Sequence, residues 1–242
     1  MKILWLGEDL VYRDYFKRFF DFILSVIAFI IFLPLLLILS IVGTVVMRGN
    51  PFFTQARPGK VDPKTGTERI FKLIKFRTMS NLKDDSGNLL PDSIRLNTYG
   101  RFLRSTSLDE LPSLINIIYG DLSIVGPRPQ LVRDMVFMNS EQRRRHIVRP
   151  GLTGLAQVSG RNNITWEQKF EYDIEYIKKI TLLEDLKIII KTIEKVLKRS
   201  DVVREGTVSD IDFGDWLFIQ KKINITEYRK KQAEARNLLN RG

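Results

Sequence analysis

The chain has 242 residues, of which 44% are hydrophobic and 28% charged, and it carries a net charge of +11 at pH 7. This length and composition predict a folded protein with a sizeable core and exclude a chain that is disordered throughout. The absence of cysteine excludes disulfides, thiolate catalysis and cysteine-based zinc sites. The positive charge favours nucleic acid, anionic lipid or a phosphorylated substrate as partner, without choosing among them.

The first predicted element is an apolar helix. Residues 22–47 form a run of 26 residues without a formal charge, which exceeds the roughly 20 residues that a membrane-spanning helix requires. Pro34 lies near its middle and removes one backbone hydrogen bond, so we expect a bend there. Each half would then reach only about 18 to 20 Å, short of the roughly 30 Å hydrocarbon core. Membrane contact is therefore expected, but the run does not by itself establish a crossing.

Basic residues flank this helix on both sides, with Lys17 and Arg18 before it and Arg48 after it. A re-entrant helix would keep both flanks on the cytoplasmic face, as the distribution of positive charge in membrane proteins favours. A kinked spanning helix is also compatible with the sequence, because many spanning helices tolerate proline. The residues alone leave the two topologies open.

The rest of the chain predicts a β-hairpin followed by helices, and thus a mostly helical α+β fold. Strand patterns at 51–55 and 69–76 are separated by turn residues, and a polar loop follows at 81–92. Capping boxes at Thr165 and Thr181 mark the starts of two helices. The expected helical segments are 98–104, 111–119, 131–137 and 141–148, a helix that starts at 165, a helix at 182–198, and a charged helix at 226–240. The helix at 182–198 carries a broad apolar stripe.

Two adjacent carboxylates, Asp109 and Glu110, form the main candidate site. Together with Ser107 they match a capping box, in which they would only complement a helix dipole by about 0.3 to 1 kcal/mol. Pro112 argues against this, because it would remove a hydrogen bond within such a helix; we expect the helix to begin near Leu111 instead. In the turn before it, one carboxylate could attack phosphorus while the other holds a divalent cation.

A phosphate site also requires cations, and guanidinium groups bind phosphate oxygens in pairs. Arg128 is held between two prolines in the segment Gly126-Pro127-Arg128-Pro129. We predict that this segment and the two carboxylates face one another around a phosphate group. The other candidate cations are Lys75, Arg77, Arg101 and Arg104.

Further polar residues are ambiguous from their patterns. Arg161, in the loop that begins at Gly160, fits a ligand contact or a solvated turn equally well. Asp173 shares a helix face with Tyr176, and Asp185 begins the next helix; either acid could be a surface or capping residue. We expect His146, the only histidine, to lie on a solvated helix face because it follows a run of arginines.

Several separated sequence blocks, in a fixed order from about residue 17 to about residue 206, carry a family resemblance. The blocks are Lys17-Arg18-Phe19-Phe20-Asp21, Phe53-Thr54-Gln55-x-Arg57-Pro58-Gly59, Lys75-Phe76-Arg77-Thr78-Met79, Ser107-Leu108-Asp109-Glu110-Leu111-Pro112, Gly120-Asp121-Leu122-Ser123-x-Val125-Gly126-Pro127-Arg128-Pro129, Arg149-Pro150-Gly151-Leu152-Thr153-Gly154 and Gly160-Arg161-Asn162. They resemble the bacterial sugar transferases of the monotopic phosphoglycosyl transferase type. Among these, the chain looks most similar to the enzymes of protein N-glycosylation that use UDP-N,N′-diacetylbacillosamine.

The resemblance implies that a sugar 1-phosphate moves from a UDP-sugar to undecaprenyl phosphate with release of UMP, by a ping-pong mechanism. It implies that Asp109 forms a covalent phosphosugar intermediate, that Asp109 and Glu110 hold Mg²⁺, and that Arg128 holds phosphates. The expected substrate-contacting residues are Lys75, Arg77, Arg104, Pro127, Arg128, Arg161, Asp173 and Asp185.

The resemblance also implies a place and partners. The enzyme would lie in the inner membrane of a bacterium with its catalytic domain in the cytoplasm, and would bind UDP-sugar, undecaprenyl phosphate and membrane lipid but no nucleic acid. Later glycosyltransferases and a homo-oligomer are left open as further associations. The expected organisation is an N-terminal segment (1–14), a re-entrant helix (15–48) bent near Pro34, a transferase domain (49–206) with amphipathic interfacial helices, and a C-terminal extension (207–242).

One residue departs from the family pattern, and two other classes of protein remain as alternatives. Leu33 stands where related sequences carry a serine whose hydroxyl could satisfy a freed carbonyl, so the sharpness of the bend is open. The alternatives are a membrane-anchored module that binds polyanions, which would be indifferent to loss of the Asp109 carboxylate, and a spanning scaffold protein.

Overall fold

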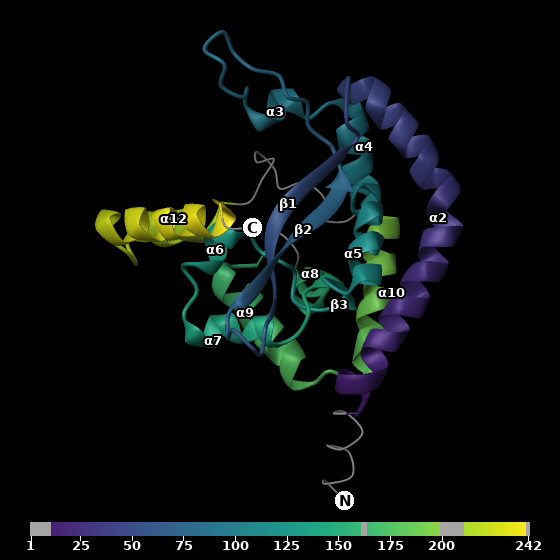
Figure 1. The fold of residues 1–242 in the computed structure, drawn as a ribbon, viewed down its shortest axis with the longest axis vertical. Helices are drawn as coiled ribbons and strands as arrows, with labels where there is room; N and C mark the ends of the chain where they lie inside the picture. Colours follow the sequence, from purple (N-terminus) through teal and green to yellow (C-terminus); the bar gives the residue numbers. More distant parts are fainter. Residues whose placement is uncertain (1–10, 161–163, 199–210, 241–242) are drawn as a thin grey trace, which may run out of the picture.

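One long helix, α2 (Lys17–Met47), runs along one side of the rest of the molecule (Figure 1). The computed structural model describes residues 11–160, 164–198 and 211–240. A short π-helix, η1 (Tyr12–Phe16), leads into α2 without a break. The expected helix is therefore present, and it begins five residues before the first residue of the uncharged run.

Helix α2 continues through Pro34 and is bowed, with its two halves running in different directions and its concave side toward the rest of the chain (Figure 1). The predicted bend is thus a bow within one helix, because proline removes only one intrahelical bond. In the second half, the hydroxyls of Ser40 and Thr44 donate to the carbonyls of Leu36 and Ser40, a contact that itself bends helices slightly.

Most apolar side chains of α2 point away from the protein. The most apolar window of the continuous helix Tyr12–Met47 has a mean hydropathy of 3.2, and only 17% of it is buried. Leu36 and Leu39 are buried, whereas Ile30, Ile31 and many other large side chains are exposed. Length and composition suffice to cross a membrane, and the outward face is apolar enough to meet lipid.

The predicted β-hairpin is confirmed. Strands β1 (Phe52–Val61) and β2 (Glu68–Phe76) pair antiparallel, with Phe52 opposite Phe76, and the first strand is longer than expected. The side chain of Asn116 hydrogen-bonds to the edge of β2 that does not pair with β1. Its oxygen accepts from the amide of Ile74, and its amide donates to the carbonyl of Lys72. One buried side chain thus fixes the hairpin against the helix that follows the candidate site.

The segment with the paired acids lies between the hairpin and α2. Helix α4 (Thr98–Thr106), the 3₁₀ helix η2 (Leu108–Ser113) and helix α5 (Leu114–Tyr119) follow one another there. Two apolar clusters hold them in place. The buried members of these clusters are Phe71, Leu73, Leu114, Ile117 and Leu122 in one, and Leu36, Leu39, Phe76 and Leu103 in the other.

A short parallel pair of strands, which the sequence pattern did not indicate, joins two of the motif blocks. Strand β3 (Ser123–Val125) pairs with β4 (Gly151–Thr153). The amide of Gly126 donates to the carbonyl of Thr153 at 2.9 Å, so the proline-flanked arginine follows directly from β3. A side chain at Gly151 would lie 2.1 Å from the nitrogen of Gly126, so only glycine fits this crossing.

The remaining helices surround these strands. The capping box of Thr165 with Gln168 is present at the start of α9, and Thr181 accepts from the amide of Glu184 at the start of α10. Short helices occupy the segments expected at 131–137 and 141–148. The bounds are α3 (Asp92–Arg95), α6 (Val132–Met135), α7 (Ser140–Arg143), η3 (Arg144–Ile147), α8 (Leu155–Ser159), α9 (Trp166–Lys178), α10 (Leu182–Lys198), α11 (Phe213–Ile219) and α12 (Ile225–Asn240).

Helix α10 is amphipathic, as expected, and its apolar row is exposed. Its N-terminal end is tied to α2 by the ion pair of Asp185 with Lys17. The row therefore starts at the same end of the molecule as α2 and suits an interfacial position. The exposed members of the row are Leu182, Leu183, Leu186, Ile190, Ile193 and Leu197.

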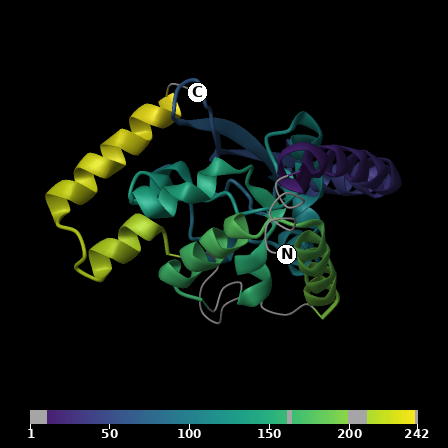
Figure 2. The same cartoon turned by 90° about the horizontal axis from the view of Figure 1, so that it is seen from below.

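The C-terminal extension is partly integrated into the domain. Phe213 of α11 is buried in an aromatic cluster with Trp166 and Phe170 of α9. Helix α12, which confirms the predicted charged helix, stands out from the body on the side opposite α2 (Figures 1 and 2).

The expectation for His146 was wrong. The residue is buried, and its ring nitrogen Nδ1 lies 3.1 Å from Glu68 Oε1. The neighbouring Arg145 is also buried, because the 3₁₀ turn of η3 directs both side chains inward. A run of basic residues therefore did not imply a solvated face.

Candidate active site

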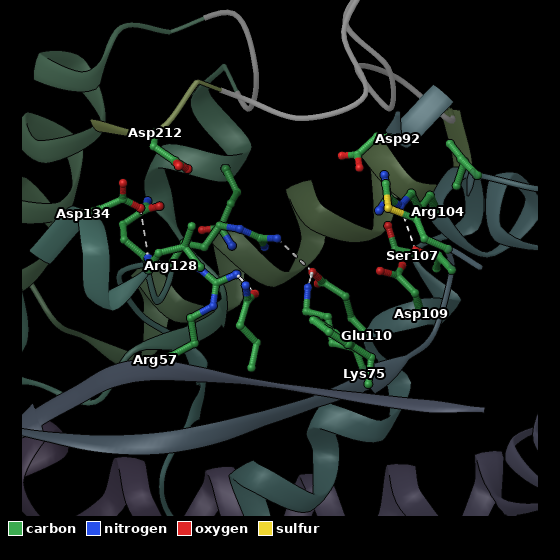
Figure 3. A pocket seen from close by; sticks show the side chains of 18 of the residues that line it. Arg57, Lys75, Asp92, Arg104, Ser107, Asp109, Glu110, Arg128, Asp134 and Asp212 are labelled. Carbon is green, nitrogen blue, oxygen red and sulfur yellow. Dashed lines mark hydrogen bonds and ion pairs between the residues drawn. The ribbon is translucent and has the colours of Figure 1, made fainter. Parts of the chain in front are cut away.

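A cavity of about 1370 Å³ contains both predicted carboxylates (Figure 3). Its wall is formed by the β-hairpin, α4, η2, the proline-flanked loop, α9 and the segment around α11. Of the predicted residues, it is lined by Lys75, Arg77, Arg104, Asp109, Glu110, Arg128 and Asp173, and also by Arg101.

Local backbone geometry places the two acids. Ser107 ends α4 in the left-handed region, with φ of 56°, so the chain turns sharply before η2. Asp109 and Glu110 then lie in the first turn of η2, and the Ser107 side chain makes no capping bond. The capping-box interpretation was therefore wrong, as Pro112 suggested. Pro112 lies within η2, and the α-helix begins at Leu114 rather than near Leu111.

Glu110 joins the two predicted halves of the site. Its Oε1 accepts from Lys75 Nζ at 2.6 Å and from Arg128 Nη2 at 3.0 Å. Burial disfavours the charged form of Glu110, but these two cations and their hydrogen bonds outweigh it and hold the pKa of Glu110 well below its ordinary value. The carboxylate stays ionised, and the acidic segment faces Arg128 as predicted.

The pKa of Asp109 is shifted in the opposite direction to that of Glu110. Burial, followed by the negative charge of Glu110, raises the pKa of Asp109 to about 6, although Lys75, Arg104 and Arg128 act against the rise. A carboxylate with a raised pKa is more basic than an ordinary one, yet it remains mostly ionised at neutral pH. Neighbouring acids with different ionisation behaviour suit different tasks in one reaction.

Two buried residues, Arg145 and Asp173, hold the loop that carries Arg128 in place. The Arg128 carbonyl accepts from Arg145 Nη2 at 2.5 Å, and Arg145 pairs with Asp173 at 2.7 Å in a fully buried contact. Burial raises the pKa of Asp173 to about 6, against the pull of Arg145. Asp173 therefore borders the cavity but acts on the Arg128 loop through Arg145. Pro127 does not line the cavity, and its carbonyl accepts from the amide of Gly151.

Arg57 is a cation of the site that our sequence analysis did not select. It lines the cavity and donates to Gln55 Oε1 at 2.6 Å and to the carbonyl of Pro129 at 3.0 Å. Burial, with the nearby charge of Arg128, lowers the pKa of Arg57 to about 10. Its presence in one of the family blocks was the available signal. Arg104, also in the cavity, donates to Thr78 Oγ1 at 3.1 Å.

Besides Pro127, one predicted residue within the described structure, Asp185, does not line this cavity. Asp185 bonds to Lys17, to the hydroxyl of Tyr12 at 2.8 Å and to that of Tyr176 at 2.8 Å, in a separate cluster. It links the start of α2 to α10. Arg161 lies outside the described residues, so its role stays a prediction.

The segment around α11 supplies a wall that the sequence did not predict. Asp212 and Asp215 line the cavity together with Ile211. Asp212 pairs with Arg133 at 2.8 Å, and burial, with the charge of Asp134, raises the pKa of Asp212 to about 6. The segment lies beyond the resemblance, and so no motif indicated it.

The donor set fits one hard divalent cation completed by substrate. No group of three or more histidines or carboxylates that could hold a metal occurs among the described residues. Magnesium is usually held by one or two carboxylates together with substrate phosphates and waters. Asp109 and Glu110 provide this, since both contacts of Glu110 with cations involve Oε1 and leave Oε2 for a ligand.

The cavity thus contains an ionised carboxylate, a more basic carboxylate beside it, and several arginines, and such groups can stabilise the charge of a reacting phosphate. Together with the apolar helix α2, which is long enough to cross a membrane, they suit a membrane-associated enzyme that acts on phosphate groups. Residues 12–199 match the family model described as bacterial sugar transferase, and the chain belongs to this family of transferases.

Curated relatives agree with this assignment. The chain is 45% identical over 195 residues to the uncharacterized sugar transferase EpsL of Bacillus subtilis, covering 80% of this chain and 93% of EpsL. It is 38% identical over 195 residues to the UDP-glucose:undecaprenyl-phosphate glucose-1-phosphate transferase of Klebsiella pneumoniae, covering 74% of this chain and 40% of that protein. The chain is 39% identical over 163 residues to the galactosyl transferase CpsE of Streptococcus agalactiae, covering 62% of this chain and 35% of CpsE.

Proposed function

We propose that this protein transfers a sugar 1-phosphate from a UDP-sugar to undecaprenyl phosphate and releases UMP. Family membership supports the proposal, as does the Klebsiella relative, whose name states a reaction of this type with glucose. The observation that carries it is Glu110, which contacts both Lys75 and Arg128 beside the more basic carboxylate of Asp109.

In the first half-reaction, an Asp109 oxygen attacks the phosphorus that bears the sugar. The bond from this phosphorus to the oxygen bridging to the second phosphate breaks, UMP leaves, and Asp109 carries the phosphosugar as an acyl phosphate. Arg128, Arg104 and Lys75 orient the phosphate oxygens and offset their charge. A Mg²⁺ ion held by Asp109 and Glu110 would supply further charge neutralisation on the diphosphate.

In the second half-reaction, an oxygen of undecaprenyl phosphate attacks the same phosphorus and displaces the Asp109 carboxylate. The product is a lipid-linked diphosphosugar, and the enzyme returns to its starting state. Using one carboxylate for both steps means that the two anionic substrates never need to react directly with each other.

The site must meet a water-soluble nucleotide and a membrane lipid, and we propose that α2 enters the membrane as a re-entrant helix with both ends on the cytoplasmic face. Its bow and the basic residues at its two ends support this. The chain has no cysteine, so single substitutions Val11→Cys and Gly49→Cys give unambiguous labels. In intact spheroplasts neither should react with an impermeant maleimide, whereas both should react after permeabilisation. Labelling of only one from outside would indicate a spanning helix.

The function is tested by measuring UMP release from UDP-sugars with undecaprenyl phosphate in detergent. Asp109→Asn should abolish release, whereas Lys83→Ala in the exposed loop should leave it unchanged. Incubation with UDP-sugar alone should add one phosphosugar to the Asp109 peptide, as seen by mass spectrometry. Full activity of Asp109→Asn would disprove the mechanism, and salt-dependent nucleic-acid binding indifferent to that substitution would favour a polyanion-binding module.

The sugar is a separate question that a panel of UDP-sugars must decide. The relatives reported above include proteins named for glucose and galactose transfer. The likeness to enzymes that use UDP-N,N′-diacetylbacillosamine stays a prediction, and no residue in the cavity identifies one sugar.

A further inference from the structure

A second cavity, of about 300 Å³, lies at the N-terminal end of α2. It shares no lining residue with the active-site cavity. Its wall combines the start of α2 with the segments around β3 and β4 and the end of α9. The lining residues are Arg13, Asp14, Lys17, Arg18, Asp21, Lys60, Ser123, Val125, Ile147, Val148, Arg149, Tyr176 and Ile180.

This cavity is rich in positive charge that internal carboxylates only partly offset. Five of the lining residues are lysine or arginine, and two are aspartate. Asp21 is buried and already accepts from Ser123 Oγ at 2.6 Å and from the amide of Ile124 at 3.1 Å. Lys17 is paired with Asp185, which lies behind the cavity. Arg13 donates to both carboxylate oxygens of Asp14. The five cations therefore exceed the three carboxylates Asp14, Asp21 and Asp185 by two formal charges.

Two of the arginines are positioned by main-chain carbonyls. Arg18 donates to the carbonyls of Ile117 and Ile118, at 2.5 and 2.7 Å, and Arg149 Nε donates to that of Gly120 at 2.8 Å. Carbonyls orient a guanidinium group without neutralising its charge. Burial lowers the pKa of Arg149, and the charge of Arg18 lowers it further. Because both guanidinium groups bond to carbonyls of the turn at 117–120, the two cations are held close together, an arrangement that an anion would stabilise.

The surroundings of the cavity are those of a membrane interface. On α2 and η1, Tyr15, Phe16 and Phe19 are 75%, 51% and 59% exposed, and on α10 Leu183 is 64% exposed. Exposed aromatic and aliphatic side chains beside lysines and arginines are typical of protein surfaces at headgroup depth. With α2 in the membrane as proposed above, on which this inference rests, the cavity opens at the depth of the lipid phosphates.

We propose that this cavity binds the phosphodiester headgroup of an anionic phospholipid, with the acyl chains lying along the exposed apolar faces of α2 and α10. Its volume is at the lower end of the range for ligand pockets, about 300 to 1,000 Å³, which suits a headgroup better than a nucleotide sugar. The bound lipid holds the start of α2 against the domain and fixes the depth of the active site. The site is separate from that of the lipid substrate.

The proposal is tested with protein purified in a neutral detergent and titrated with phosphatidylglycerol, bound lipids being counted by native mass spectrometry. The variant Arg13→Gln/Lys60→Gln changes only the rim and leaves the bonds of Arg18 and Arg149 intact. It should weaken phosphatidylglycerol binding by about tenfold or more, because each basic residue near anionic lipid contributes several-fold. The matched control Arg229→Gln/Lys230→Gln removes the same charge from α12 and should bind normally.

Three results would overturn the proposal. The first is equal phosphatidylglycerol binding by the rim variant and the control, and the second is binding of phosphatidylcholine as tight as that of phosphatidylglycerol. The third is complete displacement of the lipid by millimolar inorganic phosphate, which would indicate a site for free phosphate. The rim variant should keep wild-type UMP release in detergent, since its residues do not touch the active-site cavity. Arg149→Gln, which alters the interior of the cavity, should weaken lipid binding as well.

Discussion

Two carboxylates in this molecule both pair with cations but differ in their surroundings. Glu110 contacts Lys75 and Arg128, and Asp185 contacts Lys17 and the hydroxyls of two tyrosines. At Glu110 both cations bind Oε1, and the residue borders a large cavity. At Asp185 both oxygens are occupied, Oδ2 by Lys17 and Tyr12 and Oδ1 by Tyr176, and the residue lines neither of the two cavities described above.

The difference bears on which of the two acids is available to a ligand. A buried carboxylate whose oxygens are all bonded to the protein has nothing to offer a ligand, and its removal leaves buried donors without an acceptor. A carboxylate with one oxygen directed to a cavity is available to a ligand. Sequence spacing could not separate the two, because it does not tell which element a helix packs against.

The largest expected effect is on catalysis. Glu110→Gln keeps the shape of the side chain but removes the charge that balances Lys75 and Arg128 and would help to hold a cation. We expect UMP release to fall by about 100-fold or more, as when a main electrostatic group of an active site is lost. The measurement is kcat and KM for UDP-sugar. Glu141→Gln, in an exposed pair with Arg144, is the control, and activity of Glu110→Gln close to that of this control would contradict the assigned role.

Part of this arrangement could be predicted from the sequence and part could not. The meeting of Glu110 with Arg128 followed from Pro112, which excluded a helix cap, and from the prolines around Arg128. The hairpin followed from its turn residues. The pairing of β3 with β4 could not be predicted, because strands of three residues show no periodicity. Tertiary contacts alone place Asp185 away from the cavity.

The second expected effect is on stability. Asp185→Asn removes one partner of a buried ion pair and leaves Lys17 without its hydrogen-bonded carboxylate; breaking such a pair typically costs about 3 to 5 kcal/mol. UMP release per folded molecule should stay within about twofold of wild type, because Asp185 does not line the cavity of the proposed active site. Thermal unfolding in detergent, together with the activity assay, separates the two quantities. Glu194→Gln, in an exposed pair with Lys198 on the same helix, should not change the unfolding temperature. A catalytic collapse of Asp185→Asn at full stability would place Asp185 in the mechanism after all.

The smallest effect concerns pH. In the proposed mechanism Asp109 must be ionised to attack phosphorus, and burial, followed by the charge of Glu110, raises its pKa to about 6. UMP release should therefore be constant above this pH and fall by about tenfold per pH unit below it. Lys75 lowers the pKa of Asp109, so Lys75→Gln should move the midpoint of the fall to higher pH by several tenths of a unit or more, whatever it does to the plateau rate. Lys83→Gln, in the exposed loop, should leave the midpoint in place. An unchanged midpoint in Lys75→Gln would mean that the group titrating in the profile is not Asp109, and the distinct roles assigned to the paired acids would then have no support from pH.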